Sequence, residues 1–134
     1  MGTSQIMMVI AAVIIVGIAS VVAINQFGGT LVQANEDAVL QDCQRVLSSA
    51  ITWFRKPTAL GGGGRDWTGI TLIKLNLDAD NDNGDYSLSS TGTNITITGK
   101  GNVPNDAGNV VQVALLYNAA KDSLGGPTIT RVAP

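Results

Sequence analysis

A run of nineteen residues without a charged side chain, residues 6–24, constrains the fold of this chain more than any other feature. It reads IMMVIAAVIIVGIASVVAI, interrupted only by Gly17 and Ser20. At about 1.5 Å of rise per residue, a helix of this length covers roughly the 30 Å hydrocarbon core of a bilayer. A helix also satisfies its backbone polar groups internally in an apolar medium. The sequence therefore predicts an N-terminal helix that meets lipid or another apolar surface.

Hydropathy alone leaves three interpretations of this run open. A secretory signal peptide would begin with a basic region, and residues 1–5 contain no basic side chain. A simple membrane anchor fits the length and the composition. In the third interpretation, the helix is first held in a membrane and later packs against copies of itself.

The residues at the start of the chain favour the third interpretation. The chain runs MGTSQIMMVIAAVIIVG, with the polar Gln5 directly before the apolar run. This order resembles the mature N-terminus of the type IV pilin and pseudopilin family. The resemblance is confined to the N-terminal arm, where the positions that agree with the common pilin pattern are Met7, Val9, Ile10 and Ala11.

The resemblance implies a route of processing and assembly. A prepilin peptidase would remove a leader, and Met1 would be the new, methylated N-terminus. The pilus assembly machinery would then draw the subunit from the inner membrane into a helical homo-oligomer, an extracellular filament on the cell surface. The helix would form the filament core, with assembly contacts at Gln5, Ile6, Met7, Val9, Ile10, Val13, Ile14, Gly17 and Val21.

Three positions depart from the family pattern, and one of them is Met1, where pilins usually carry a phenylalanine. Pilins usually carry a glutamate where this chain has Gln5, which accepts a hydrogen bond from an ammonium group but brings no charge. Bacterial pilins often carry a proline late in the arm, where this chain has Val22. We expect the major structural subunit of a type IV pilus-like filament. A pseudopilin of a type II secretion system and a membrane-anchored extracellular binding module remain alternatives.

The apolar arm is followed by two adjacent glycines, Gly28 and Gly29. Each glycine costs a helix about 1 kcal/mol relative to alanine, so this pair is the weakest point of the long helix. The pair therefore predicts a hinge, with a bend or an unwound stretch there in the assembled filament. The spacing of residues 30–33 also suits a capping box, which would begin a separate helical segment at Thr30.

Residues 30–56 have the apolar period of an amphipathic helix. Arg55 and Lys56 suit a helix C-terminus, and Pro57 disfavours helix at the residue before it, so we end the helix near Arg55. The apolar face of this helix contains Val32, Val39, Leu40, Cys43, Val46, Leu47, Ala50, Trp53 and Phe54.

Beyond a glycine-rich loop the apolar period changes to two, which is typical of strands. The expected strands are residues 69–77, 86–90, 94–98, 110–117 and 128–132. Short connections predict an antiparallel meander, one face of which can bury the amphipathic helix. The expected fold is thus α+β, a long hydrophobic N-terminal helix packed on a small antiparallel sheet. The expected units are residues 1–29 for membrane and polymerisation, 30–56 for the amphipathic half of the helix, and 57–134 for the sheet head.

An acidic segment is the one candidate for a metal site. Carboxylates alternate along residues 78–85, and hard oxygen ligands at that density suit calcium. The spacing departs from an EF-hand, because Ser89 stands where the bidentate acid should be, and a solvated turn explains the pattern equally well. The candidate calcium ligands are Asp78, Asp80, Asp82 and Asp85.

The composition excludes several classes of function. The 134 residues contain no histidine, so histidine-based metal sites, triads and imidazole acid–base steps are absent. Ser48 and Ser49 therefore lack a histidine base, and we expect no enzymatic activity. A net charge of −2 and a pI near 4.7 give no sign of a nucleic-acid-binding surface.

Overall fold

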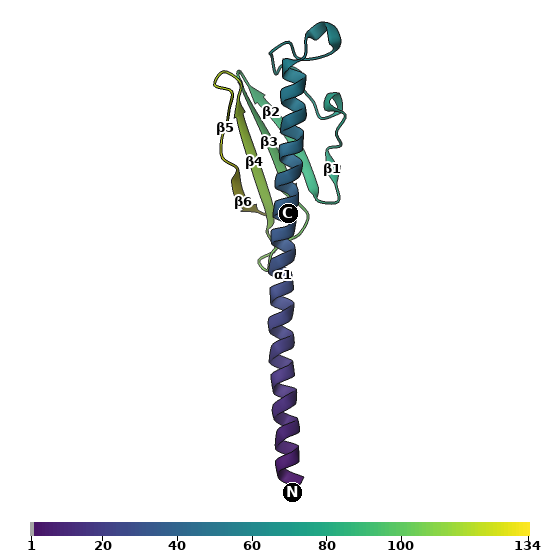
Figure 1. Cartoon of the computed structure of the whole chain (residues 1–134), viewed down its shortest axis with the longest axis vertical. Coiled ribbons are helices and arrows are strands. Elements are labelled where there is room, and N and C mark those ends of the chain that lie inside the picture. Colours follow the sequence, from purple (N-terminus) through teal and green to yellow (C-terminus); the bar gives the residue numbers. More distant parts are fainter. Residues whose placement is uncertain (1) are drawn as a thin grey trace.

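The computed structural model describes residues 2–134 as one long helix and a small antiparallel sheet (Figure 1). Helix α1 spans Gly2–Arg55, and its second half lies across one face of the sheet while its first half projects away from it. The strands are β1 (Asp80–Asn81), β2 (Gly84–Thr91), β3 (Asn94–Gly101), β4 (Val110–Asn118), β5 (Ser123–Leu124) and β6 (Thr128–Val132). The expected α+β architecture is confirmed.

The sheet is an antiparallel meander in which two strands, β5 and β6, share the outer edge of β4. Strands β1 to β5 follow one another in sheet order, and β6 pairs with the first half of β4, beside β5. In the register of β3 with β4, Ile95 lies opposite Tyr117 and Ile97 opposite Leu115. Because paired residues share a face, these four side chains all point toward the helix.

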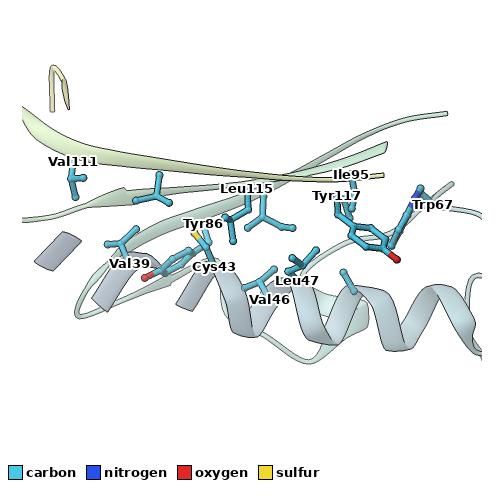
Figure 2. Close-up of a cluster of buried hydrophobic side chains, with 13 residues drawn as sticks. Val39, Cys43, Val46, Leu47, Trp67, Tyr86, Ile95, Val111, Leu115 and Tyr117 are labelled. Carbon is cyan, nitrogen blue, oxygen red and sulfur yellow. The ribbon is translucent and has the colours of Figure 1, made fainter. Parts of the chain in front are cut away.

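The second half of α1 supplies the other side of the core (Figure 2). The apolar period derived from the sequence is confirmed there, since the helix residues that are buried are Asn35, Val39, Cys43, Val46, Leu47, Ala50 and Trp53. Trp67, from the loop after the helix, closes one end of the core. It stacks on Phe54 with 4.3 Å between ring centroids and meets Tyr117 edge-on.

Two glycines in β3 let the helix lie close to the sheet. A methyl group at Gly99 would come within 2.7 Å of both the Cys43 sulfur and a Val39 methyl. A methyl group at Gly101 would meet the side chain of Asn35. Every other residue of β3 from Ile95 to Gly101 faces the helix, so the strand extends beyond the expected 94–98.

The expected strand over residues 69–77 is wrong. This segment contains the 3₁₀ helix η2 (Ile73–Leu75), and Asn76 adopts the left-handed conformation at its end. Local backbone hydrogen bonds, such as Leu77 N–H to Leu72 O at 3.0 Å, replace the bonds of a sheet ladder. The apolar residues that suggested alternation instead pack, half buried, against the edge of the core: Ile70, Leu72, Leu75 and Leu77.

Smaller features also differ from expectation. The two-residue strands β1 and β5 were not expected from the sequence. Thr30 begins no separate helical segment, because its hydroxyl donates to Gln26 O within the continuous helix. The helix ends at Arg55, as expected.

Replacing Gly99 by alanine should destabilise the head, because the added methyl group forces the helix or Tyr86 to move. Overpacking of this kind costs about 1–3 kcal/mol. Chemical denaturation of the full chain in detergent, followed by tryptophan fluorescence, measures the change. Gly126→Ala is the matched control, since a methyl group there meets nothing within 4 Å. Equal stabilities for the two variants would contradict the close approach of helix and sheet.

Candidate functional site

The first half of α1 is an apolar arm that no other segment of residues 2–134 covers. Every residue from 2 to 27 is exposed, with side chains such as Met7 at 74% and Ile24 at 70% exposure. At about 1.5 Å of rise per residue, these 26 residues extend about 40 Å from the head (Figure 1). An arm of this kind needs an apolar environment from outside the subunit.

Between Ile6 and Ile24 the arm carries a single polar side chain, Ser20. The Ser20 hydroxyl donates to Val16 O at 2.8 Å, so its hydrogen is satisfied inside the helix. The most apolar 18-residue window has a mean hydropathy of 3.0, and none of it is buried. The arm is therefore long and apolar enough to cross a membrane.

The structure does not separate the expected assembly contacts from the rest of the arm. At about 100° per residue they are spread over more than half of the helix circumference, and the intervening positions are apolar as well. A helix that is apolar on all sides suits burial on all sides. Gln5 lies on the exposed surface of the first turns, and the expected N-terminus, Met1, lies outside the described residues. The contacts expected on this surface are Gln5, Ile6, Met7, Val9, Ile10, Val13, Ile14, Gly17 and Val21.

The junction between the arm and the head lies at the glycine pair. In the isolated subunit the helix runs without a break through Gly28 and Gly29. A methyl group at Gly28 would lie 3.9 Å from an Asp106 carboxylate oxygen, and one at Gly29 would meet nothing within 4 Å. Packing in the subunit therefore does not require glycine at either position. The pair lowers the stability of the helix at this point, and the expected hinge in the filament stays a prediction.

The acidic segment is tied to the helix through Asp42. One carboxylate oxygen of Asp42 accepts hydrogen bonds from Asn81 Nδ2 at 3.0 Å, Asn83 Nδ2 at 2.8 Å and the Tyr86 hydroxyl at 2.7 Å. Asn35 adds a further link by donating to Asn83 O at 2.8 Å. These contacts hold the β1–β2 turn against the middle of α1.

This network sets the titration of the groups that form it. Burial opposes ionisation of Asp42, but the three hydrogen bonds and the charge of Arg45 hold the pKa of its carboxyl below the ordinary value of 3.8. Burial and the neighbouring carboxylate raise the pKa of Tyr86. Burial also raises the pKa of Cys43 to about 12, so this side chain is a neutral thiol at pH 7.

The candidate calcium ligands are not gathered around one point. Asp80 lies opposite Asp85 in the β1–β2 pair, and Asp78 lies nearer the helix, beside Asp42 and Arg45. Within residues 2–134, no group of three or more acidic or cysteine side chains is placed to hold a metal ion. The turn satisfies itself instead, since Asn81 Oδ1 accepts from the backbone N–H of Asn83 and of Gly84. Calcium binding by Asp78, Asp80, Asp82 and Asp85 stays a prediction.

The role of Asp42 was not predicted from the sequence. The signal was weak, because one acid among several on a polar face gives no indication of its partner. The same holds for Glu36, which accepts from Arg131 of β6 at 2.8 Å and ties the last strand to the helix. Both contacts join residues that are far apart in the sequence.

Comparison of the chain with protein-family models, curated proteins and solved structures finds no match.

Asp42→Asn should lower the free energy of unfolding by about 1 kcal/mol at pH 7, since hydrogen bonds to a charged group are lost at a partly exposed position. The folded-state pKa is depressed, so the contribution is present above about pH 4 and fades as the pH falls through the folded pKa. Denaturation of wild type and variant from pH 7 to pH 3 tests this. Asp37→Asn, at an exposed position of the same helix, is the control. A gap between wild type and Asp42→Asn that is constant with pH would contradict the assignment.

If the acidic segment binds calcium, excess calcium should raise the melting temperature of the full chain and a chelator should lower it. A ligand that binds only the folded state stabilises it by mass action. Asp80→Asn with Asp82→Asn should remove the response. If calcium does not change the melting temperature of the wild type, the acidic segment is a solvated turn and the calcium prediction is wrong.

Gly28→Ala with Gly29→Ala should stiffen filaments of this chain. Each change favours the helix by about 1 kcal/mol, and the added methyl groups meet no clash in the subunit. Persistence lengths from electron micrographs of wild-type and variant filaments measure the effect. Unchanged stiffness, with straight helix through both positions in wild-type filaments, would refute the hinge.

Proposed function

We propose that this chain is the structural subunit of an extracellular, type IV pilus-like filament. The observation that carries the proposal is the exposed arm, which is apolar on all sides and continuous with the helix that forms one side of the head core. In the proposed filament, arms from many copies pack together along the axis, and the heads surround them.

The energetics of the arm support association. In water, each buried valine, leucine or isoleucine side chain contributes about 1.5–3 kcal/mol, and the arm contains many of them. In a bilayer this driving force is absent, because lipid is as apolar as the side chains. A subunit can therefore rest in the cytoplasmic membrane before assembly and be held firmly among other arms after it leaves the membrane.

The head has the polarity expected of a filament coat. One face of the sheet is covered by α1, and the opposite face carries hydroxyl side chains. In the paired strands β2 and β3, Ser87 lies opposite Thr98 and Ser89 opposite Thr96. These residues alternate with the core residues of the same strands, so they point away from the helix. A head arranged in this way presents a polar surface when its helix faces the filament axis.

Ile14→Asp should abolish filaments, because it places a charge in the packed arms. Leu60→Asp is the matched control: it puts the same charge in place of a leucine that is 66% exposed on the head, and we expect normal filaments. Electron microscopy of the source cells, with mass spectrometry of sheared filaments, gives the readout.

The outcomes separate this proposal from its alternatives. Long wild-type filaments built from this chain support it, and normal filaments from Ile14→Asp would contradict it. Short assemblies confined to the cell envelope would favour a pseudopilin. A chain that stays in the membrane as single copies would favour an anchored binding module.

A further inference from the structure

The charged side chains of the head are sorted along the helix axis. The end farthest from the arm carries five of the eight basic residues and two acids, namely Arg55, Lys56, Arg65, Lys74, Lys121, Asp66 and Asp122. The part of the head nearer the arm carries the other eight acids and three basic residues, namely Glu36, Asp37, Asp42, Asp78, Asp80, Asp82, Asp85, Asp106, Arg45, Lys100 and Arg131. The head is thus positive at its outer end and negative near the arm.

The positive end contains a groove of about 390 Å³ beside the last turns of α1. Lys56 and Lys74 line it, no acidic residue does, and both lysines are exposed. Lys74 is held in place, since its Nζ donates to Gly69 O at 2.6 Å and lies 5.9 Å from the centre of the Trp53 ring. Trp53 also lines the groove, and its indole N–H has no hydrogen-bond partner within residues 2–134. The groove therefore presents two cations and no carboxylate.

The negative part contains a matching group of free charges. Asp80 and Asp82 are exposed at the β1–β2 turn, and Asp78 precedes them. Within the described residues the ion pairs are Arg55 with Asp122 and Arg131 with Glu36, so these three acids are unpaired there. The hydrogen bonds from Asn81 and Asn83 to Asp42 fix the turn on the helix.

The two groups are separated along the axis by a defined step. The turn is tied to the helix at Asp42, and the groove is lined by residues from Ser48 to Lys56, with Ser49 and Trp53 seven and eleven residues beyond Asp42. At about 1.5 Å per residue this places the groove about 10–17 Å farther from the arm. Parallel copies at the same level would set like charges side by side. Copies displaced by that step would set acids against lysines.

We propose that neighbouring copies contact one another through these two surfaces, with residues 78–82 of one head on the Lys56–Lys74 groove of the next. This inference rests on the proposed function and names the head contact of that filament. Because the two surfaces differ and are offset along the axis, the contact repeats without closing, as an open helical assembly requires. It disfavours association at one level in the membrane and favours the staggered filament. An exposed ion pair is weak alone, but the filament repeats it at every subunit.

Charge reversal in the full chain tests the contact. Lys56→Glu with Lys74→Glu, or Asp80→Lys with Asp82→Lys, should each lower filament yield by about tenfold or more, because like charges then oppose each other. Combining all four changes should restore the yield to within about threefold of wild type, since the attraction is re-formed with opposite sign. Lys100→Glu with Lys121→Glu, which makes the same change of charge outside the groove, should leave the yield unchanged.

A second measurement needs no variant. Filaments assembled from a mixture of isotopically light and heavy chains, treated with a carbodiimide, should give cross-links between a groove lysine and Asp78, Asp80 or Asp82 of a different copy. Reversal variants with wild-type yield, or a combined variant that is not restored while its head melts like the wild type, would overturn the contact. Absence of wild-type filaments would instead overturn the proposed function.

Discussion

The exposure of the apolar arm outside the head is the constraint on which the rest of the structure depends. Residues 2–27 leave the head as bare helix, and no segment of residues 2–134 folds back to cover them. A helix that is apolar on every side is stable in lipid or among similar helices, because its backbone is already satisfied and its side chains require no water. Transfer to water would expose more than a dozen large apolar side chains at once. The capacity of the arm to span a membrane and the self-association that we propose both rest on this one property.

The same helix also forms one side of the head core, so the arm and the head are mechanically coupled. Val39, Cys43 and Val46 pack directly on the sheet, and Gly99 allows that close approach. Asp42 and Glu36 then fix the two sides of the head, the β1–β2 turn and strand β6, to the helix. The head cannot slide along α1 without breaking these contacts. A displacement of the arm is therefore transmitted to the head along the continuous helix.

Much of the fold was predictable because it is encoded in local periods. The helical stripe that includes Val39 and Val46, and the alternation in β4, each appear in a short window of sequence. The features that the sequence did not predict depend on contacts between residues that are far apart in the chain. Residues 69–77 alternate like a strand, yet they form a 3₁₀ helix and local turns, from which their apolar side chains pack against the core. Asp42 could not be distinguished from its solvated neighbours before the fold brought Asn81 and Asn83 beside it. The structure does not single out assembly contacts on the arm, because nearly every position between residues 6 and 24 is both apolar and exposed.

A helical reconstruction, by electron cryomicroscopy, of filaments sheared from cells that produce this chain would show the proposed arrangement directly. We expect density in which residues 6–24 of every copy pack around the filament axis, out of contact with water, with the heads outside and the hydroxyl face of each sheet toward solvent. Filaments whose core is formed by the sheets, with the arms exposed or absent, would contradict it.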